Sequence, residues 1–366
     1  MELRQAVGSL MVVGLNGAEL TGLERAWLSV VRPAGIILFR RNIEDVPQSR
    51  ALLDAATTLA APAALRCVDL EGGSVDRLRD ALAPMPSAQA VARAMRHKNK
   101  PALAAEHGTL IARAVRAFGF NTTLAPVLDL GLSVSAKVMG SRTAGETPEE
   151  VAEYAAAFVT ALTAAGVVGC GKHFPGLGSG TLDSHLATPS IERSFRTLWQ
   201  QDLAPYRSLR TVLPMVMISH AAYPLTGGKN TPASVSRYWI ESVLRKKIGY
   251  KGLVFSDDLE MGGILNHMSM EEATVESIRA GMDLIEICHS PELILRAFEA
   301  LLREGERSRA FRKLLLARAT RTQRLRSKII VPRKDKSAPH LEALTARIRA
   351  FSAKVESLQA AKESAA

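Results

Sequence analysis

Residues 252–258 read GLVFSDD, a short apolar run that ends in two aspartates. A continuous apolar run suits a strand that is buried on both faces, as the strands of a parallel sheet are. Seven further runs of this kind recur along the chain. The eight runs cover 9–14, 34–39, 64–69, 118–124, 166–171, 214–219, 252–256 and 282–288.

Amphipathic stretches separate these runs. In residues 147–164 the pattern predicts a helix, with Thr147 as its N-cap, Pro148 at the first helical position and acidic residues in the first turn. Strand–helix alternation repeated eight times predicts an α/β fold, a (β/α)8 barrel of the TIM type, over residues 1–330. A doubly wound open sheet is the alternative.

The end of the chain has a different pattern, which predicts a separate C-terminal helical tail over residues 331–366. Pro332–Ser337 is expected to be a linker, and an apolar stripe with spacings of three and four follows it. The stripe consists of Leu341, Leu344, Ile348, Phe351, Val355 and Leu358. Two interpretations stay open: the helix packs on its own barrel, or it pairs with a second copy in a homodimer.

Composition narrows the class of protein. The chain has 366 residues, 47% of them hydrophobic, which is enough for a sizeable core. Cys67, Cys170 and Cys288 lie far apart and have no zinc-binding spacing, so we expect reduced, buried thiols in a cytoplasmic protein. The first residues do not resemble a signal peptide, and no apolar run is long enough for a bilayer, so we expect no membrane partner.

The net charge of +11 is concentrated in residues 307–334, which are rich in lysine and arginine and contain no acidic residue. Such a run can bind nucleic acid or anionic lipid. No nucleic-acid-binding motif accompanies it. We therefore interpret the run as a solvated helix face and expect no nucleic-acid partner.

Polar residues gather just past the apolar runs. In a barrel of parallel strands the chemistry lies at the ends of the strands, so these side chains predict one shared polar pocket. They are Arg40, Arg41, Asn42, Asp69, Glu71, Asp129, Lys172, His173, His220, Asp257, Asp258 and His289.

Asp257 is the candidate nucleophile of this pocket. An ionised carboxylate at the tip of a buried strand is costly unless it is paired or used in function. Asp258 has a simpler explanation as the N-cap of a following helix, whereas Asp257 has none.

A second candidate lies in residues 171–189, GKHFPGLGSGTLDSHLATP. Asp183 and His185 are two residues apart, so in an extended loop they face the same way. A carboxylate beside an imidazole fixes its tautomer, and the pair predicts an oriented general acid/base. Lys172 and His173 lie at the end of the preceding run. They are expected to bind a ligand oxygen or to keep a carboxylate ionised. A carboxylate nucleophile and an acid/base are the minimum set for retaining glycoside hydrolysis.

These motifs resemble those of the family-three glycoside hydrolases, specifically the single-domain bacterial β-N-acetylhexosaminidases. The resemblance runs over about residues 5–330 and is most specific in KHFPG…DSH and SDDLEM. It implies a nucleophile at Asp257, an acid/base at His185 and its partner at Asp183. It further implies sugar-binding roles for Asp69, Arg77, Arg142, Lys172 and His173.

The implied substrates are terminal, non-reducing β-linked N-acetylglucosamine residues, typically on peptidoglycan fragments that are recycled in the cytoplasm, with no cofactor and no metal. The chain departs from the family pattern at Ser74, where an arginine is usual, at Leu177, where a histidine is usual, and over residues 178–181, where Gly-Asp-Thr is usual. These departures put loop closure and substrate range in question.

Other functions stay open from the sequence. A metal-dependent hydrolase would use His173, His185 and His220 as ligands. A phosphorylase or a β-glucosidase-like hydrolase would use the same pocket, and a protein with an impaired site would bind sugar without turning it over.

Overall fold

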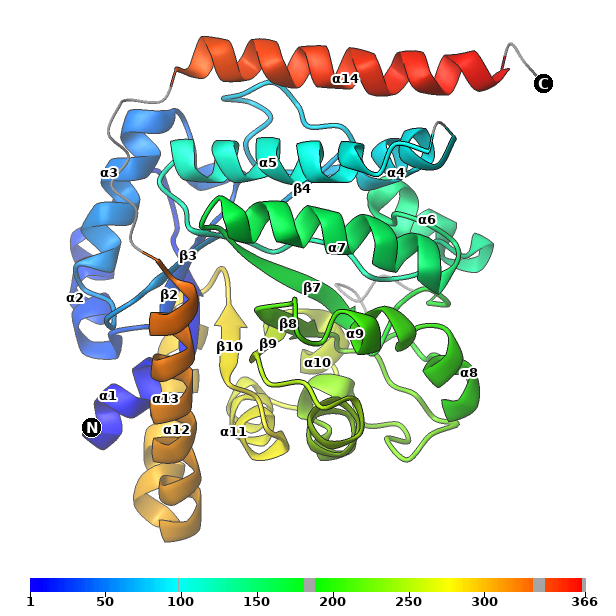
Figure 1. Ribbon diagram of the computed structural model, residues 1–366. Helices are drawn as coiled ribbons and strands as arrows, with labels where there is room; N and C mark the ends of the chain where they lie inside the picture. The colour runs from blue at the N-terminus through cyan, green and yellow to red at the C-terminus, as the bar shows by residue number, and fades with distance from the viewer. Residues whose placement is uncertain (98, 181–187, 332–339, 364–366) are drawn as a thin grey trace.

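The computed structural model describes residues 1–97, 99–180, 188–331 and 340–363 (Figure 1). Eight parallel strands close into a barrel in the order β1-β10-β9-β8-β7-β6-β3-β2. The strands are β1 Met11–Gly14, β2 Gly35–Leu38, β3 Leu65–Val68, β6 Thr122–Thr123, β7 Val168–Phe174, β8 Met215–Ile218, β9 Leu253–Asp258 and β10 Leu284–Ile287.

Each of the eight apolar runs supplies one of these strands. Because β1 pairs with both β10 and β2, the sheet has no free edge. The (β/α)8 barrel is therefore confirmed, and the open doubly wound sheet is wrong.

The helices surround this barrel. They are α1 Leu3–Gly8, α2 Gly22–Val31, α3 Val46–Thr57, α4 Ala88–His97, α5 Ala102–Ala117, α6 Ala136–Met139, α7 Pro148–Ala164, α8 Phe195–Gln200, α9 Ala204–Ser208, α10 Gly262–Leu265, α11 Met270–Ala280, α12 Pro291–Arg307, α13 Arg309–Ile329 and α14 Leu341–Glu363, with a helix of π type over Tyr238–Ile248.

The predicted helix over residues 147–164 is α7, and its start is confirmed. The Thr147 side chain accepts a hydrogen bond from the backbone N–H of Glu150, with Pro148 in the first turn. Capping by a hydroxyl satisfies one of the backbone donors that the first turn leaves without a partner.

A short antiparallel hairpin follows β3 and forms one wall of the strand-end face. It consists of β4 Leu70–Gly72 and β5 Val75–Asp76. Gly72 has φ +90°, and a Cβ there would lie 2.2 Å from the carbonyl oxygen of Pro86. Because the hairpin lies so close to the segment before α4, and because φ is positive, only glycine fits this position.

The inside of the barrel is filled by apolar side chains from the strands. Cys67, Cys170 and Cys288 belong to this interior layer and are free thiols, as the sequence predicted. Among the described residues, no helix has the length and apolar character that a membrane crossing requires.

Helix α13 carries the basic run, and the interpretation as a solvated face is wrong for part of it. Arg318 pairs with Glu241, and the guanidinium of Arg321 lies 3.1 Å from the Asp283 carboxylate. Arg326 is fully buried and donates to the backbone oxygens of residues 34, 62 and 63. These arginines attach α13 to the barrel.

The tail is helical over α14, which lies across α4 and α5 (Figure 1). Leu344, Ile348, Phe351 and Val355 of the apolar stripe are buried there. The Phe351 ring stacks on His107 with 5.9 Å between the ring centroids. The stripe is thus covered by its own chain, whereas the expected linker Pro332–Ser337 lies outside the described residues.

Candidate active site

A cavity of about 360 Å³ opens at the carboxyl ends of the strands. Six of the eight predicted site residues line it, and they come from β7, β9 and the segments that follow β3 and α6. They are Asp69, Arg77, Arg142, Lys172, His173 and Asp257. The other two, Asp183 and His185, lie outside the described residues.

Asp257 stands near the end of β9. Strand alternation puts it on the same inward side as Leu253 and Phe255, which belong to the interior layer. Its Oδ1 accepts a hydrogen bond from the backbone N–H of Asp258 at 3.0 Å. Within the described parts of the chain no other hydrogen bond reaches this carboxylate, so it is available to a ligand.

Asp258 is not the N-cap of a helix, which corrects the sequence interpretation. Its Oδ1 accepts from the backbone N–H of Glu260 at 3.0 Å and stabilises a turn, and the next helix, α10, begins only at Gly262. Burial and the neighbouring Glu260 carboxylate raise the pKa of Asp258 to about 7. The Asp258 carboxyl therefore binds a proton more readily than an ordinary aspartate does.

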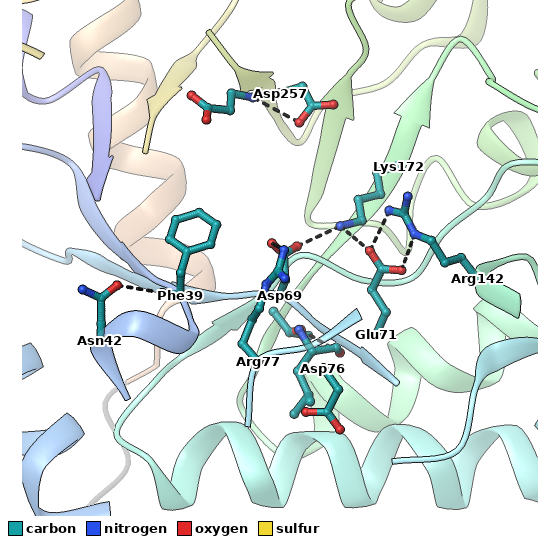
Figure 2. A network of polar contacts seen from close by, with 12 residues as sticks. Phe39, Asn42, Asp69, Glu71, Asp76, Arg77, Arg142, Lys172 and Asp257 are labelled. Carbon is teal, nitrogen blue, oxygen red and sulfur yellow. Dashed lines mark hydrogen bonds and ion pairs between the residues drawn. The ribbon is translucent and has the colours of Figure 1, made fainter. Parts of the chain in front are cut away.

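A network of buried charges lies below Asp257 (Figure 2). The Lys172 ammonium lies 2.9 Å from Asp69 Oδ1 and 2.6 Å from Glu71 Oε1. Arg142 makes two parallel hydrogen bonds to the Glu71 carboxylate, both 2.9 Å long. Arg77 approaches the other oxygen of Asp69 at 3.5 Å.

This network controls the charge of its acids. Burial alone would raise the pKa of Asp69, but the charges of Lys172 and Arg77 hold it below its usual value. Burial would likewise raise the pKa of Glu71, and Arg142 and Lys172 lower it strongly. Both carboxylates are therefore ionised at neutral pH, and Asp69 keeps an oxygen that can accept a hydrogen bond from a ligand hydroxyl.

His173 is held by Asp129, which follows β6. The ring Nδ1 lies 2.6 Å from Asp129 Oδ2, and the ring Nε2 lies 3.3 Å from Arg142 Nη2. Because a guanidinium can only donate, Nε2 is the acceptor and Nδ1 carries the proton. Asp129 also accepts from the backbone N–H of Leu177 at 2.6 Å, so it ties the end of β7 to the loop that follows.

Comparison with known proteins decides the family. A sequence model of the glycosyl hydrolase family 3 N-terminal domain matches residues 2–325. The chain belongs to glycosyl hydrolase family 3.

Individual relatives agree with this assignment. A protein named beta-hexosaminidase from Alkalilimnicola ehrlichii is 39% identical over 291 residues, which are 79% of this chain and 82% of the relative. A family 3 β-N-acetylglucosaminidase from Paenibacillus superposes with a TM-score of 0.85 at 31% identity, covering 96% of this chain and 68% of that one. Native NagZ from Neisseria gonorrhoeae superposes with a TM-score of 0.76 at 30% identity, covering 95% and 97%.

The metal-ligand set suggested by the sequence is not assembled from the described histidines of this family 3 member. His173 is engaged by Asp129 and Arg142, and the ring of His220 hydrogen-bonds Ser234 Oγ and the backbone oxygen of Asp258. A different group, Asp258, Glu260 and His289, brings its potential ligand atoms within 4.8 Å of one another.

Glu260 of that group already has a structural use. Its carboxylate accepts hydrogen bonds from the backbone N–H groups of residues 288, 289 and 290. Glu260 therefore anchors the segment between β10 and α12.

Two acids in the family 3 site had no assigned role in the sequence analysis. Glu71 and Asp129 were identified only as polar residues past a strand. Their roles are indirect, because Glu71 holds Lys172 and Arg142, and Asp129 holds His173. The available signal was an acid directly after an apolar run, but sequence alone does not say which cation it faces.

Proposed function

We propose that this glycoside hydrolase releases terminal, non-reducing β-linked N-acetylglucosamine with retention of configuration, through a glycosyl-enzyme intermediate. The single observation that carries the proposal is the pocket in which Asp257 faces the network of Asp69, Lys172 and Arg77. An unencumbered carboxylate suits a nucleophile, and ionised and cationic groups on the opposite wall suit sugar hydroxyls. The names of the similar proteins support the same sugar.

In the first step an Asp257 oxygen attacks the anomeric carbon, and the bond to the leaving oxygen breaks. His185, oriented by Asp183, gives its proton to that oxygen. In the second step the neutral imidazole takes a proton from water, the water oxygen bonds to the anomeric carbon, and Asp257 is released as a carboxylate.

The sugar is held by the other predicted residues. Asp69 accepts hydrogen bonds from hydroxyls, and Arg77, Lys172 and His173 contact ring substituents. Arg142 keeps Glu71 ionised, and the ion pair holds Lys172 in place. Lys172 and Glu71 are buried, and the charged groups are already paired with one another, so binding requires little reorganisation.

The natural source of the sugar, the compartment and the domain limits belong to the same proposal. We propose peptidoglycan fragments as substrates, in line with the likeness to NagZ, and a cytoplasmic location, in line with three free, buried cysteines. The catalytic unit is residues 1–330, and the tail is residues 331–366. The buried stripe of α14 supports packing on the barrel over a homodimer through the tail.

The test is the release of nitrophenol from an aryl β-N-acetylglucosaminide and from an aryl β-glucoside. We expect clear preference for the former, the same rate with and without inorganic phosphate, no sugar 1-phosphate, and activity that survives EDTA. A preference for glucoside, or formation of sugar 1-phosphate, would replace the proposal with one of the other family activities. Binding of N-acetylglucosamine without any turnover would indicate an impaired site.

A further inference from the structure

Glu286 is an acid in the interior layer of the barrel. On β10 the side chains of Leu284, Glu286 and Cys288 alternate to the inside, and Leu284 and Cys288 belong to the apolar interior layer. Glu286 is 2% exposed. Glu286 lines the same cavity as Asp257, Asp69 and Lys172.

The backbone of Glu286 is fully engaged, whereas its carboxyl is not. The backbone N–H donates to Ser256 Oγ at 3.0 Å, and the backbone oxygen accepts from Leu259 at 2.9 Å. The side-chain Oε1 is buried and has no hydrogen-bond partner among the described residues. The strand is thus fixed, and a residue at the wall of the pocket has a buried carboxyl oxygen without a hydrogen-bond partner among the described residues.

The surroundings of Glu286 favour the neutral form of its carboxyl. Burial raises its pKa well above the usual range, and the negative charges of Asp258, Asp69 and Asp257 raise it further, against a weaker opposing effect of Lys172. A neutral carboxylic acid has a hydroxyl that donates and a carbonyl oxygen that accepts. It therefore presents both kinds of hydrogen-bonding group to the cavity.

A structural role does not explain this residue. An apolar side chain would continue the layer made by Leu284 and Cys288, and an unsatisfied buried polar atom weakens the fold. Ligand pockets place a few such polar groups in apolar surroundings, where the ligand supplies the missing partner. A site built to hydrogen-bond a hydroxyl also rejects sugars that lack it.

We propose that Glu286 is a substrate-contacting residue that hydrogen-bonds one hydroxyl of the sugar in this pocket and thereby selects which sugar is accepted. The inference rests on the proposed function, because it requires that a sugar occupy this cavity. Glu286 makes and breaks no covalent bond in this account. Asp257 remains the nucleophile.

The experiment compares Glu286→Gln and Glu286→Leu on an aryl β-N-acetylglucosaminide and on its 3-, 4- and 6-deoxy analogues. Gln keeps a neutral donor and acceptor, so kcat/KM should stay within about threefold of the wild type, while Leu should lose about tenfold or more. On one deoxy analogue the wild type and Glu286→Leu should become equal, because the contacted hydroxyl is absent. That analogue identifies the hydroxyl.

Stability provides a second readout. Glu286→Leu removes a buried, unpartnered carboxyl, so its melting temperature should equal or exceed that of the wild type. Leu284→Met, two residues earlier on the same strand, is the matched control for disturbance of β10. The relative kcat/KM values of this variant on the parent substrate and the three deoxy analogues should equal those of the wild type.

Three results would overturn the inference. Equal kinetics for the wild type and both variants on every substrate would make Glu286 a buried bystander. Equal losses for Gln and Leu would exclude a contact through a neutral carboxyl. A loss that persists unchanged on all three deoxy analogues would exclude a contact with a hydroxyl.

If the wild type lacks turnover, the proposed function fails, and calorimetric binding of free N-acetylglucosamine decides the inference separately. Weaker binding by Glu286→Leu than by Glu286→Gln supports it. Equal binding, or no binding, contradicts it.

Discussion

Lys172 stands between Asp69 and Glu71, and this arrangement sets the charge on the sugar-binding side of the pocket. All three side chains are largely buried, so their interactions are weakly screened by water. Removing one member of such a network leaves another charge without its partner inside the protein, which typically costs about 3–5 kcal/mol. The network therefore contributes to the site and to the fold at once.

Glu71→Gln tests this double role. Lys172 keeps Asp69, but Arg142 loses its two charged hydrogen bonds, so we expect a loss of stability of about 3 kcal/mol and a reduced kcat/KM. Thermal unfolding and the aryl glycoside assay provide the two measurements. An unchanged melting temperature would show that the Arg142 pair is compensated by other contacts.

The same acids predict an acid-sensitive fold. The pKa values of Asp69 and Glu71 are lower in the folded protein than usual, so their ionised forms stabilise it. This stabilisation is complete above the unfolded pKa values of roughly 4 and is lost as the pH falls toward the folded values. Melting temperature should therefore fall below about pH 4, and less steeply in Glu71→Gln. If the melting temperatures of the wild type and of Glu71→Gln fell equally steeply with decreasing pH, the result would contradict this explanation.

The acid/base proposal has a kinetic test. With His185→Ala, a substrate whose leaving group needs protonation should lose roughly 10²–10⁴-fold in rate, and an activated nitrophenyl glycoside much less. Asp183→Ala should show a milder loss and an altered pH profile. Equal losses on both substrates would mean that His185 positions the sugar.

At the scale of elements, the tail helix α14 stabilises the fold by packing its apolar side chains against α4 and α5. Phe351 of α14 is 2% exposed, and its ring stacks on His107 of α5. Lys354, one turn further along the same helix, makes an exposed ion pair with Glu106 of α5. The two residues therefore separate apolar burial from surface charge.

We expect Phe351→Ala to lower stability by about 3–5 kcal/mol and Lys354→Ala by less than about 1 kcal/mol. Turnover by the folded protein should change little in either variant, and a truncation after Val331 should likewise remain active while it is folded. Thermal melts and kcat measured well below the melting temperature check this. A folded truncation without activity would show that the tail shapes the site.

The elements also show what sequence can predict. All eight barrel strands were found, because a strand buried on both faces is a continuous apolar run. The β4–β5 hairpin was missed, since LEGGSVD is short and mostly polar and its pairing depends on Gly72 fitting against Pro86. The inward arginines of α13 were missed because Asp283 and the carbonyls that they bind come from distant segments.

For the whole molecule, barrel closure brings residues from distant parts of the chain to one pocket. Position at a strand end predicted Asp69, Lys172, His173 and Asp257, because the fold sends every strand end to the same face. The residues that hold these side chains in place, such as Glu71 and Asp129, could not be predicted. The spacing of residues in the sequence does not tell which side chains meet in the folded protein. Glu286 was also missed in the sequence, because it lies inside an apolar run and the candidate residues were sought just past the runs.

The central claim is that Asp257 forms the covalent bond to the sugar. The most direct measurement is mass spectrometry of peptides after reaction with a fluorinated sugar that traps the intermediate. The account predicts one sugar on Asp257, none on Asp258, and no label in a folded Asp257→Ala protein that has lost turnover. A sugar on Asp258, or turnover with no trapped intermediate and with inversion at the anomeric carbon, would contradict it.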